Sequence, residues 1–274
     1  MKKIGFIIIL AIISLVIFQQ CQKNTQAVLS ENTSNTQFDK VLQLLKERGI
    51  TTSNSRDDKL EYRNAFCYQN DPDSCYDLGI LYDTVFIPNV CNEAAVQYHA
   101  YWCPATSNFN YTDFHATPLE PACKNIWDWW QHLYDIGHLT EMSLAIDSFE
   151  YAASKSAEEN LAYAFLVGYN IYCPNNFLSV NYHIQLCYQH CVKYNGKGSW
   201  PRFDIFKVDC GVHCCTRTRE FCLNPDGSMH SANEDYEEVL GECGPDALNS
   251  GECQNAGGIL IGDCERECGP PPTN

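Results

Sequence analysis

The chain has 274 residues, of which 45% are hydrophobic and 12% aromatic, so it can build a packed core and is not a disordered protein. Its formal net charge at pH 7 is −16. So acidic a surface repels phosphate backbones and anionic lipid headgroups, and we therefore exclude nucleic acid as a partner.

The first residues have the pattern of an export signal. Lys2 and Lys3 precede an uncharged apolar run over residues 4–18. This run is shorter than the about 20 apolar residues that a membrane-spanning helix needs, and it has the length of a cleaved signal. We therefore predict a signal peptide over 1–20, followed by Cys21 as the lipidation site.

Residues 21–37 are polar, and we interpret them as a flexible tether between an acyl anchor in the bilayer and the folded body. Gln19 and Gln20 stand where a lipoprotein signal has a small residue, which leaves two alternatives open. One is ordinary cleavage after Ala27, which gives a secreted protein. The other is an uncleaved anchor.

Cysteine usage agrees with export. The chain has 17 cysteines, and setting Cys21 aside leaves an even sixteen. An even number in an exported protein indicates disulfides, although it does not indicate which cysteines pair. The candidates are Cys67, Cys75, Cys91, Cys103, Cys123, Cys173, Cys187, Cys191, Cys210, Cys214, Cys215, Cys222, Cys243, Cys253, Cys264 and Cys268.

The signal, the candidate anchor, the tether and the cysteine content together resemble cysteine-rich exported bacterial lipoproteins. The resemblance covers the first forty residues and the cysteine-rich C-terminal half. It implies a place in the cell envelope, lipid-anchored and facing the periplasm or the surface, or secretion. It implies no particular functional family.

The next part of the chain is read from its apolar spacing. Residues 38–48 have the period of a helix, and residues 78–87 that of a strand. Residues 94–102 fit either a helix or a strand. Residues 104–122 contain three prolines and several polar residues, and we predict a loop there.

A helical block is predicted over the centre of the chain. Apolar residues between Ile126 and Tyr134 share one face of a helix that ends at Gly137, and a second helix follows over 142–152. Ser156 and Glu159 have the spacing of a capping box, which predicts the start of a third helix.

After this block the period changes to that of strands. We predict strands over 178–186, 203–208, 212–221 and 259–261, with turns at 195–198 and 224–227 and an extended tail at 270–272. The expected fold class is α+β, a helical N-terminal and central block followed by a small disulfide-rich antiparallel β region. The expected units are a mainly helical body over 38–200 and a cysteine-rich β module over 201–274, which can also form one domain.

Adjacent Cys214 and Cys215 lead to a specific expectation. Two neighbouring cysteines cannot comfortably bond to each other, and on a strand their side chains point to opposite faces. We therefore expect two bonds to two different partners.

Two constellations suggest alternative chemistry. Cysteines and histidines at short spacing form a ligand set that suits zinc, in Cys187, His190, Cys191, Cys210, His213 and Cys214. Asp128, His132 and Asp135 share one helix face and are weak candidates for acid–base catalysis. In an exported protein we favour disulfides over zinc, and a solvated polar face over a catalytic one.

The sequence therefore favours a disulfide-stabilised envelope or surface protein that binds a protein or a glycan, or has a structural role, without a cofactor. Catalysis is not the favoured reading, because common hydrolase and nucleotide-binding motifs are absent from the sequence. The alternatives are a secreted hydrolase that uses Asp, Glu and His side chains and a Cys/His metal-binding protein.

Overall fold

The computed structural model describes residues 36–53, 67, 75–196, 199, 201–244 and 250–271. The predicted signal peptide, Cys21 and nearly all of the predicted tether lie outside the described residues, as does residue 272 of the predicted tail. Among the described residues 45% lie in strands and 29% in helices.

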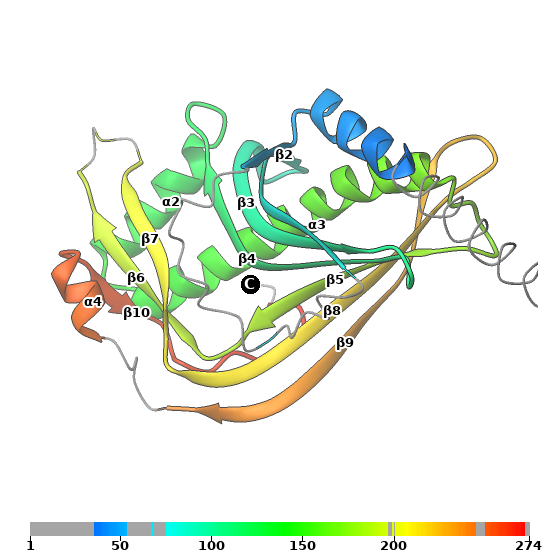
Figure 1. The fold of residues 1–274 in the computed structure, drawn as a ribbon. Coiled ribbons are helices and arrows are strands. Elements are labelled where there is room, and N and C mark those ends of the chain that lie inside the picture. The colour runs from blue at the N-terminus through cyan, green and yellow to red at the C-terminus, as the bar shows by residue number, and fades with distance from the viewer. Residues whose placement is uncertain are drawn as a thin grey trace, which may run out of the picture.

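The main element is a seven-stranded, strongly curved sheet (Figure 1). Its pairs are antiparallel except for the fourth and fifth strands, which are parallel over a short stretch. In spatial order the strands are β1 (Thr51–Ser53), β2 (Tyr76–Ile87), β3 (Cys91–Cys103), β4 (Asn108–Pro118), β5 (Leu178–Gln185), β8 (Gly211–Leu223) and β9 (Met229–Cys243).

A second, three-stranded antiparallel sheet lies beside the first. Its order is β10 (Ile259–Ile261), β6 (Tyr188–Tyr194) and β7 (Phe203–Asp209). β5 runs into β6 and β7 runs into β8, so the chain passes from one sheet to the other and back.

Four helical segments accompany the sheets. They are a helix over 36–47, α2 (Lys124–Asp135), α3 (Leu139–Tyr169) and α4 (Ser250–Asn255). The long α3 packs against β2, β3, β4, β5, β8 and β10 (Figure 1). No helix within the described ranges combines the length and the apolar character that crossing a membrane requires.

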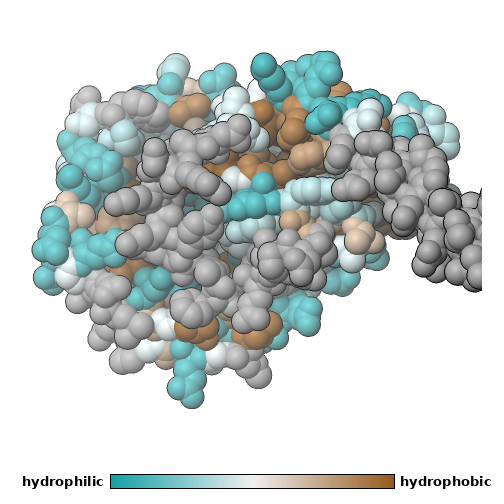
Figure 2. Space-filling model, viewed as in Figure 1, coloured by the Kyte–Doolittle hydropathy of each residue, from teal (hydrophilic) through white to brown (hydrophobic). Residues whose placement is uncertain are grey.

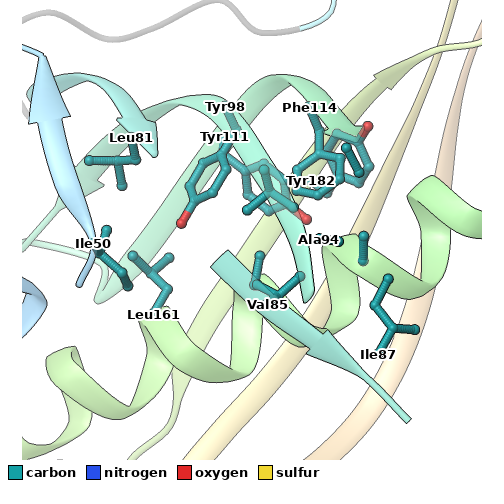
Figure 3. Packing of buried hydrophobic residues seen from close by; sticks show 14 of the residues in the cluster. Ile50, Leu81, Val85, Ile87, Ala94, Tyr98, Tyr111, Phe114, Leu161 and Tyr182 are labelled. Carbon is teal, nitrogen blue, oxygen red and sulfur yellow. The ribbon is translucent and has the colours of Figure 1, made fainter. Parts of the chain in front are cut away.

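The core lies between α3 and the large sheet. Alanines make the buried face of α3 thin, so Trp102, Phe109 and Tyr111 of the sheet can approach it closely. Tyr98, Tyr111 and Tyr182 form an aromatic layer above Leu161 of α3 (Figure 3). The ring centroids of Tyr111 and Tyr182 are 4.5 Å apart.

The first helix is held against α3 at a glycine. A Cβ on Gly168 would lie 2.3 Å from Cγ2 of Val41, so only glycine permits this approach. Among the coloured residues in the view of Figure 2, those at the rim are mostly hydrophilic, and hydrophobic ones gather in the upper middle. That distribution agrees with the acidic composition.

One buried ion cluster joins α3 to β8. Glu158 of α3 is 1% exposed and accepts hydrogen bonds from Tyr111, Arg217 and Arg219. The Arg217 guanidinium also lies over the rings of Tyr151 and Tyr182. The carboxylate is therefore compensated by two guanidinium groups at the centre of the molecule.

The structure confirms the expected disulfide-stabilised body, with all sixteen candidate cysteines paired. Cys214 and Cys215 bond to two different partners, as their adjacency requires. The pairs are Cys67–Cys214, Cys75–Cys103, Cys91–Cys123, Cys173–Cys222, Cys187–Cys243, Cys191–Cys253, Cys210–Cys264 and Cys215–Cys268.

The predicted fold class is wrong. In place of a helical block followed by a small β region, a large sheet runs through the molecule, from Thr51 to Cys243. Most neighbouring strands of this sheet are consecutive in the chain, but the pairs β4–β5 and β5–β8 join strands distant in sequence, and local periodicity does not detect such pairing. Residues 94–102 belong to β3, and the predicted loop over 104–122 contains the whole of β4.

The helical and later strand predictions have mixed outcomes. The first helix, α2, β2, β5, β7, β8 and β10 are confirmed. The two predicted helices over 142–152 and from Ser156 are one continuous α3, so the capping box does not start a helix. β6 and β9 were not predicted.

Candidate functional site

A cavity of about 240 Å³ lies between the end of β4, the start of β7 and the inner face of α2. An apolar cavity of about 150 Å³ can hold a benzene ring, so this one accommodates a single six-membered ring with substituents. Its lining residues are His115, Ala116, Thr117, Pro118, Trp127, Trp130, Pro201, Phe203, Asp204 and Ile205.

The sheet topology explains why this place is open. β5 pairs with β4 only from Asn108 to Tyr111, and β5 then pairs onward with β8. Within the described part of the chain, the second half of β4 has no strand partner on that side. Residues from β4, β7 and α2 converge there on one space.

His115 is the titratable side chain of β4 in this cavity. Its side chain is 35% exposed, whereas that of its partner Glu150 on α3 is 7% exposed. The His115 Nδ1 atom lies 3.1 Å from Glu150 Oε1, and Lys207 Nζ of β7 lies 2.6 Å from Glu150 Oε2. A buried carboxylate thus supports an accessible imidazole.

The electrostatics of Glu150 keep it ionised. Burial alone would raise the pKa of its carboxyl, but the charge of Lys207 and the hydrogen bond to His115 outweigh burial and hold the pKa well below its usual range. A carboxylate can only accept a hydrogen bond, so the proton in the contact belongs to His115 Nδ1. With the proton on Nδ1 alone, Nε2 is an acceptor.

The other nitrogen of His115 meets a hydroxyl. Thr117 Oγ1 lies 3.3 Å from His115 Nε2. The two residues are separated by one position on β4, which places their side chains on the same face of the strand. Hydroxyl, imidazole and carboxylate therefore form a continuous chain that begins at the cavity and ends in the core.

The tryptophans of α2 complete the cavity wall. Trp127 Nε1 donates to the backbone oxygen of Pro118 at 2.9 Å. Trp130 is 1% exposed, and its Nε1 has no hydrogen-bond partner among the residues that the structure describes. A buried N–H without a partner costs free energy.

Behind Glu150 the polar network continues into the C-terminal part. Asp147 of α3 accepts from Arg266 Nε at 2.9 Å and from Tyr188 Oη at 2.6 Å. His190 Nδ1 lies 2.9 Å from Ser143 Oγ, and burial lowers the pKa of His190 to about 4, so the ring is neutral.

Asp147, Glu150 and His190 are close enough to resemble a metal-binding group. Lys207 and Arg266 already neutralise the two carboxylates, so a divalent cation would meet two positive charges. We therefore infer that these three residues have a structural role. They hold β6 and the segment around Arg266 against α3.

The sequence-predicted acid–base candidates lie elsewhere on α2. Asp128, His132 and Asp135 are exposed, on the face opposite the buried Trp127 and Trp130. Asp128 accepts from Lys124 and Arg202, and Asp135 accepts from Gln131. The structure does not bring these three residues to the cavity.

The Cys/His set proposed for zinc is divided among disulfides. Its four cysteines bond to Cys243, Cys253, Cys264 and Cys67 respectively. His190 contacts Ser143, and His213 Nε2 lies 2.8 Å from Glu238. A second ligand-like group, His213, Cys243 and Glu265, also includes a disulfide sulfur.

Sequence reasoning missed His115, Thr117 and Glu150. The first two lay in a predicted loop, and Glu150 lay in a predicted helix without any motif around it. A usable signal was the alternation of apolar and polar residues from Phe109 to Thr112, which is typical of a half-buried strand.

The chain was also compared with protein-family models, with curated proteins and with solved structures. None of them matches. The function is therefore argued from the geometry of the site.

Proposed function

We propose that this protein is an exported, lipid-anchored protein of the cell envelope that binds a glycan at the cavity between β4, β7 and α2. The eight disulfides support export, because such bonds persist in oxidising compartments. The pattern before Cys21 supports the anchor.

The observation that carries the binding role is the mixed character of the cavity. Trp127, Trp130 and Phe203 lie in its wall and are each at most 2% exposed, and His115 and Asp204 supply accessible polar groups from two different strands. Ligand sites typically combine an apolar lining with a few convergent polar groups. A sugar ring matches this combination, since its hydroxyls can hydrogen-bond to the accessible His115 and Asp204 side chains while its C–H groups meet the apolar part of the wall.

Asp204 is the polar group whose removal tests ligand binding. Its side chain lines the cavity and is 49% exposed. The Asp204 Oδ2 atom lies 3.8 Å from Lys193 Nζ. We expect Asp204→Ala to weaken sugar binding about tenfold or more, because a hydrogen bond to a charged group contributes about 1.5–3 kcal/mol. Saturation-transfer NMR and calorimetric titration with glucose, galactose and N-acetylglucosamine measure it.

Lys193→Ala is the matched control for this variant. It breaks the same exposed ion pair, and Lys193 is not among the residues that line the cavity. Unchanged affinity for Lys193→Ala and weakened affinity for Asp204→Ala support the proposal. Absence of binding by the unmodified protein to all three sugars rejects the glycan class.

The anchor is tested at Cys21. We expect the full chain to incorporate radiolabelled palmitate in a bacterial host and to fractionate with membranes, because an acylated N-terminal cysteine inserts into the bilayer. Cys21→Ala removes the acceptor thiol, and we expect it to abolish the label and release the protein. A Cys21→Ala protein that still carries palmitate contradicts lipidation at this residue.

A further inference from the structure

Three groups at the cavity have the mutual arrangement that nucleophilic catalysis requires. A nucleophile must contact a base, and the base must be oriented by a third group. Thr117 Oγ1 is 3.3 Å from His115 Nε2, and His115 Nδ1 is 3.1 Å from Glu150 Oε1. The contacts use the two different nitrogens of one ring, so a proton leaving the hydroxyl can be accepted at Nε2.

The burial of the three groups also fits nucleophilic catalysis. Glu150 is buried and fixed on its other side by Lys207, whereas His115 and Thr117 line the cavity. The imidazole is therefore held in orientation from the core, while its side chain, 35% exposed, lines a space that a substrate can enter. A histidine with a purely packing role would not need this opening.

A fourth feature concerns developing negative charge. Attack on an ester carbonyl produces an oxyanion, which hydrogen-bond donors in a water-poor site stabilise. Trp130 lines the same cavity, and its buried Nε1 is without a partner in the described structure. It is thus a donor already present in the wall.

We propose that Thr117, His115 and Glu150 form an acyl-transfer centre that removes small acyl groups, such as acetyl, from hydroxyls of a bound ring. The inference deepens the proposed function and rests on the same cavity. The volume of about 240 Å³ accommodates one ring with a short acyl group.

In the first half of the reaction Thr117 Oγ1 bonds to the acyl carbon, and its proton moves to His115 Nε2. The bond from the acyl carbon to the alcohol oxygen then breaks, and His115 returns the proton to that oxygen. In the second half a water attacks the acyl carbon, its proton passes through His115, and Thr117 regains its hydroxyl. The sum is ester plus water to carboxylic acid plus alcohol, without a change of oxidation state.

The nucleophile is tested by covalent labelling of the full chain. A fluorophosphonate probe reacts with activated hydroxyls, and we expect mass spectrometry of the digested protein to place it on Thr117. Thr117→Val keeps the size and shape of the side chain and should abolish the label, whereas Thr117→Ser should retain it. Thr140→Val, an exposed threonine on α3, is the matched control.

Turnover is tested with 4-nitrophenyl acetate and an acetylated monosaccharide. We expect Thr117→Val and His115→Gln to lower kcat/KM by about 100-fold or more, as loss of a nucleophile or of its base does. His132→Ala, an exposed histidine on α2, should leave the rate unchanged. Circular dichroism confirms that each variant is folded.

The outcomes separate this inference from the proposed function. Sugar binding without ester hydrolysis, or a probe attached to a residue other than Thr117, overturns the acyl-transfer centre and leaves glycan binding intact. Hydrolysis that depends on Thr117 without affinity for free sugars supports the centre and rejects glycan binding. Equal rates for the unmodified protein and Thr117→Val overturn the centre.

Discussion

Replacing Glu158 by alanine is expected to destabilise the folded protein by about 3–5 kcal/mol, because it leaves buried cations without their counterion. Glu158 is 1% exposed, and Arg217 and Arg219 both donate to it. Arg217 has an exposed side-chain fraction of 0%, so water cannot replace the lost carboxylate. The Tyr111 hydroxyl loses its acceptor as well.

Urea denaturation monitored by tryptophan fluorescence measures this loss as a decrease of the transition midpoint. Glu159→Ala is the matched control on the same helix, because Glu159 also pairs with Arg219 but has a side chain that is 49% exposed. An exposed pair contributes about 0–1 kcal/mol. Equal losses for the two variants would contradict a central role of the buried cluster.

The cluster also shows what the sequence could and could not predict. The helical period between residues 126 and 168 is local, and it correctly indicated α2 and the helical character of α3, although it divided α3 into two helices. The partners of Glu158 lie on β8, about sixty residues away in the chain. No pattern within a window of ten or twenty residues contains that relation.

β9 is the clearest case of a strand without a sequence signal. It is an edge strand with exposed acidic side chains at Asp235, Glu237, Glu238 and Glu242. Charges on an edge strand hinder pairing with other chains, and they also remove the apolar alternation on which strand prediction relies. β4 was missed for another reason. The prolines at 104, 118 and 121 led to the prediction of a loop, but in the structure they flank or end the strand and do not interrupt it.

The candidate site could not be predicted either, because its residues are distant from one another in the sequence. His115 and Glu150 are 35 positions apart, and Lys207 comes from a third element, so no spacing rule applies. The even cysteine count predicted the disulfides but not their connectivity. Four pairs join the first eight cysteines to the last eight: Cys67–Cys214, Cys173–Cys222, Cys187–Cys243 and Cys191–Cys253.

Removing the Cys210–Cys264 bond is expected to open the stretch between Cys253 and Cys268 locally before the rest of the protein unfolds, while the Cys191–Cys253 and Cys215–Cys268 bonds keep its two ends attached. The small core under this segment consists almost entirely of cysteine sulfur, with Val208 as its other buried member. The bond closes a separation of 54 residues, and a loop of that length corresponds to about 4 kcal/mol in the chain-entropy model. The neighbouring disulfides constrain the same chain, so we expect a loss of about 2–4 kcal/mol.

Trypsin reports this local opening directly. Arg266 lies within the segment and binds Asp147, so its peptide bond is protected while the segment is docked. The double variant Cys210→Ala with Cys264→Ala should be cleaved after Arg266 at least about tenfold faster, since local opening governs cleavage when reclosing is fast.

The matched control is Cys75→Ala with Cys103→Ala, which removes a bond at the other end of the molecule over a separation of 28 residues. We expect it to lower the global midpoint without accelerating cleavage after Arg266. If both double variants are cleaved there at the same rate, the contacts of the segment with α3 hold it in place, and the Cys210–Cys264 disulfide does not. In that event Asp147→Asn, which weakens the Arg266 ion pair, should accelerate the cleavage instead.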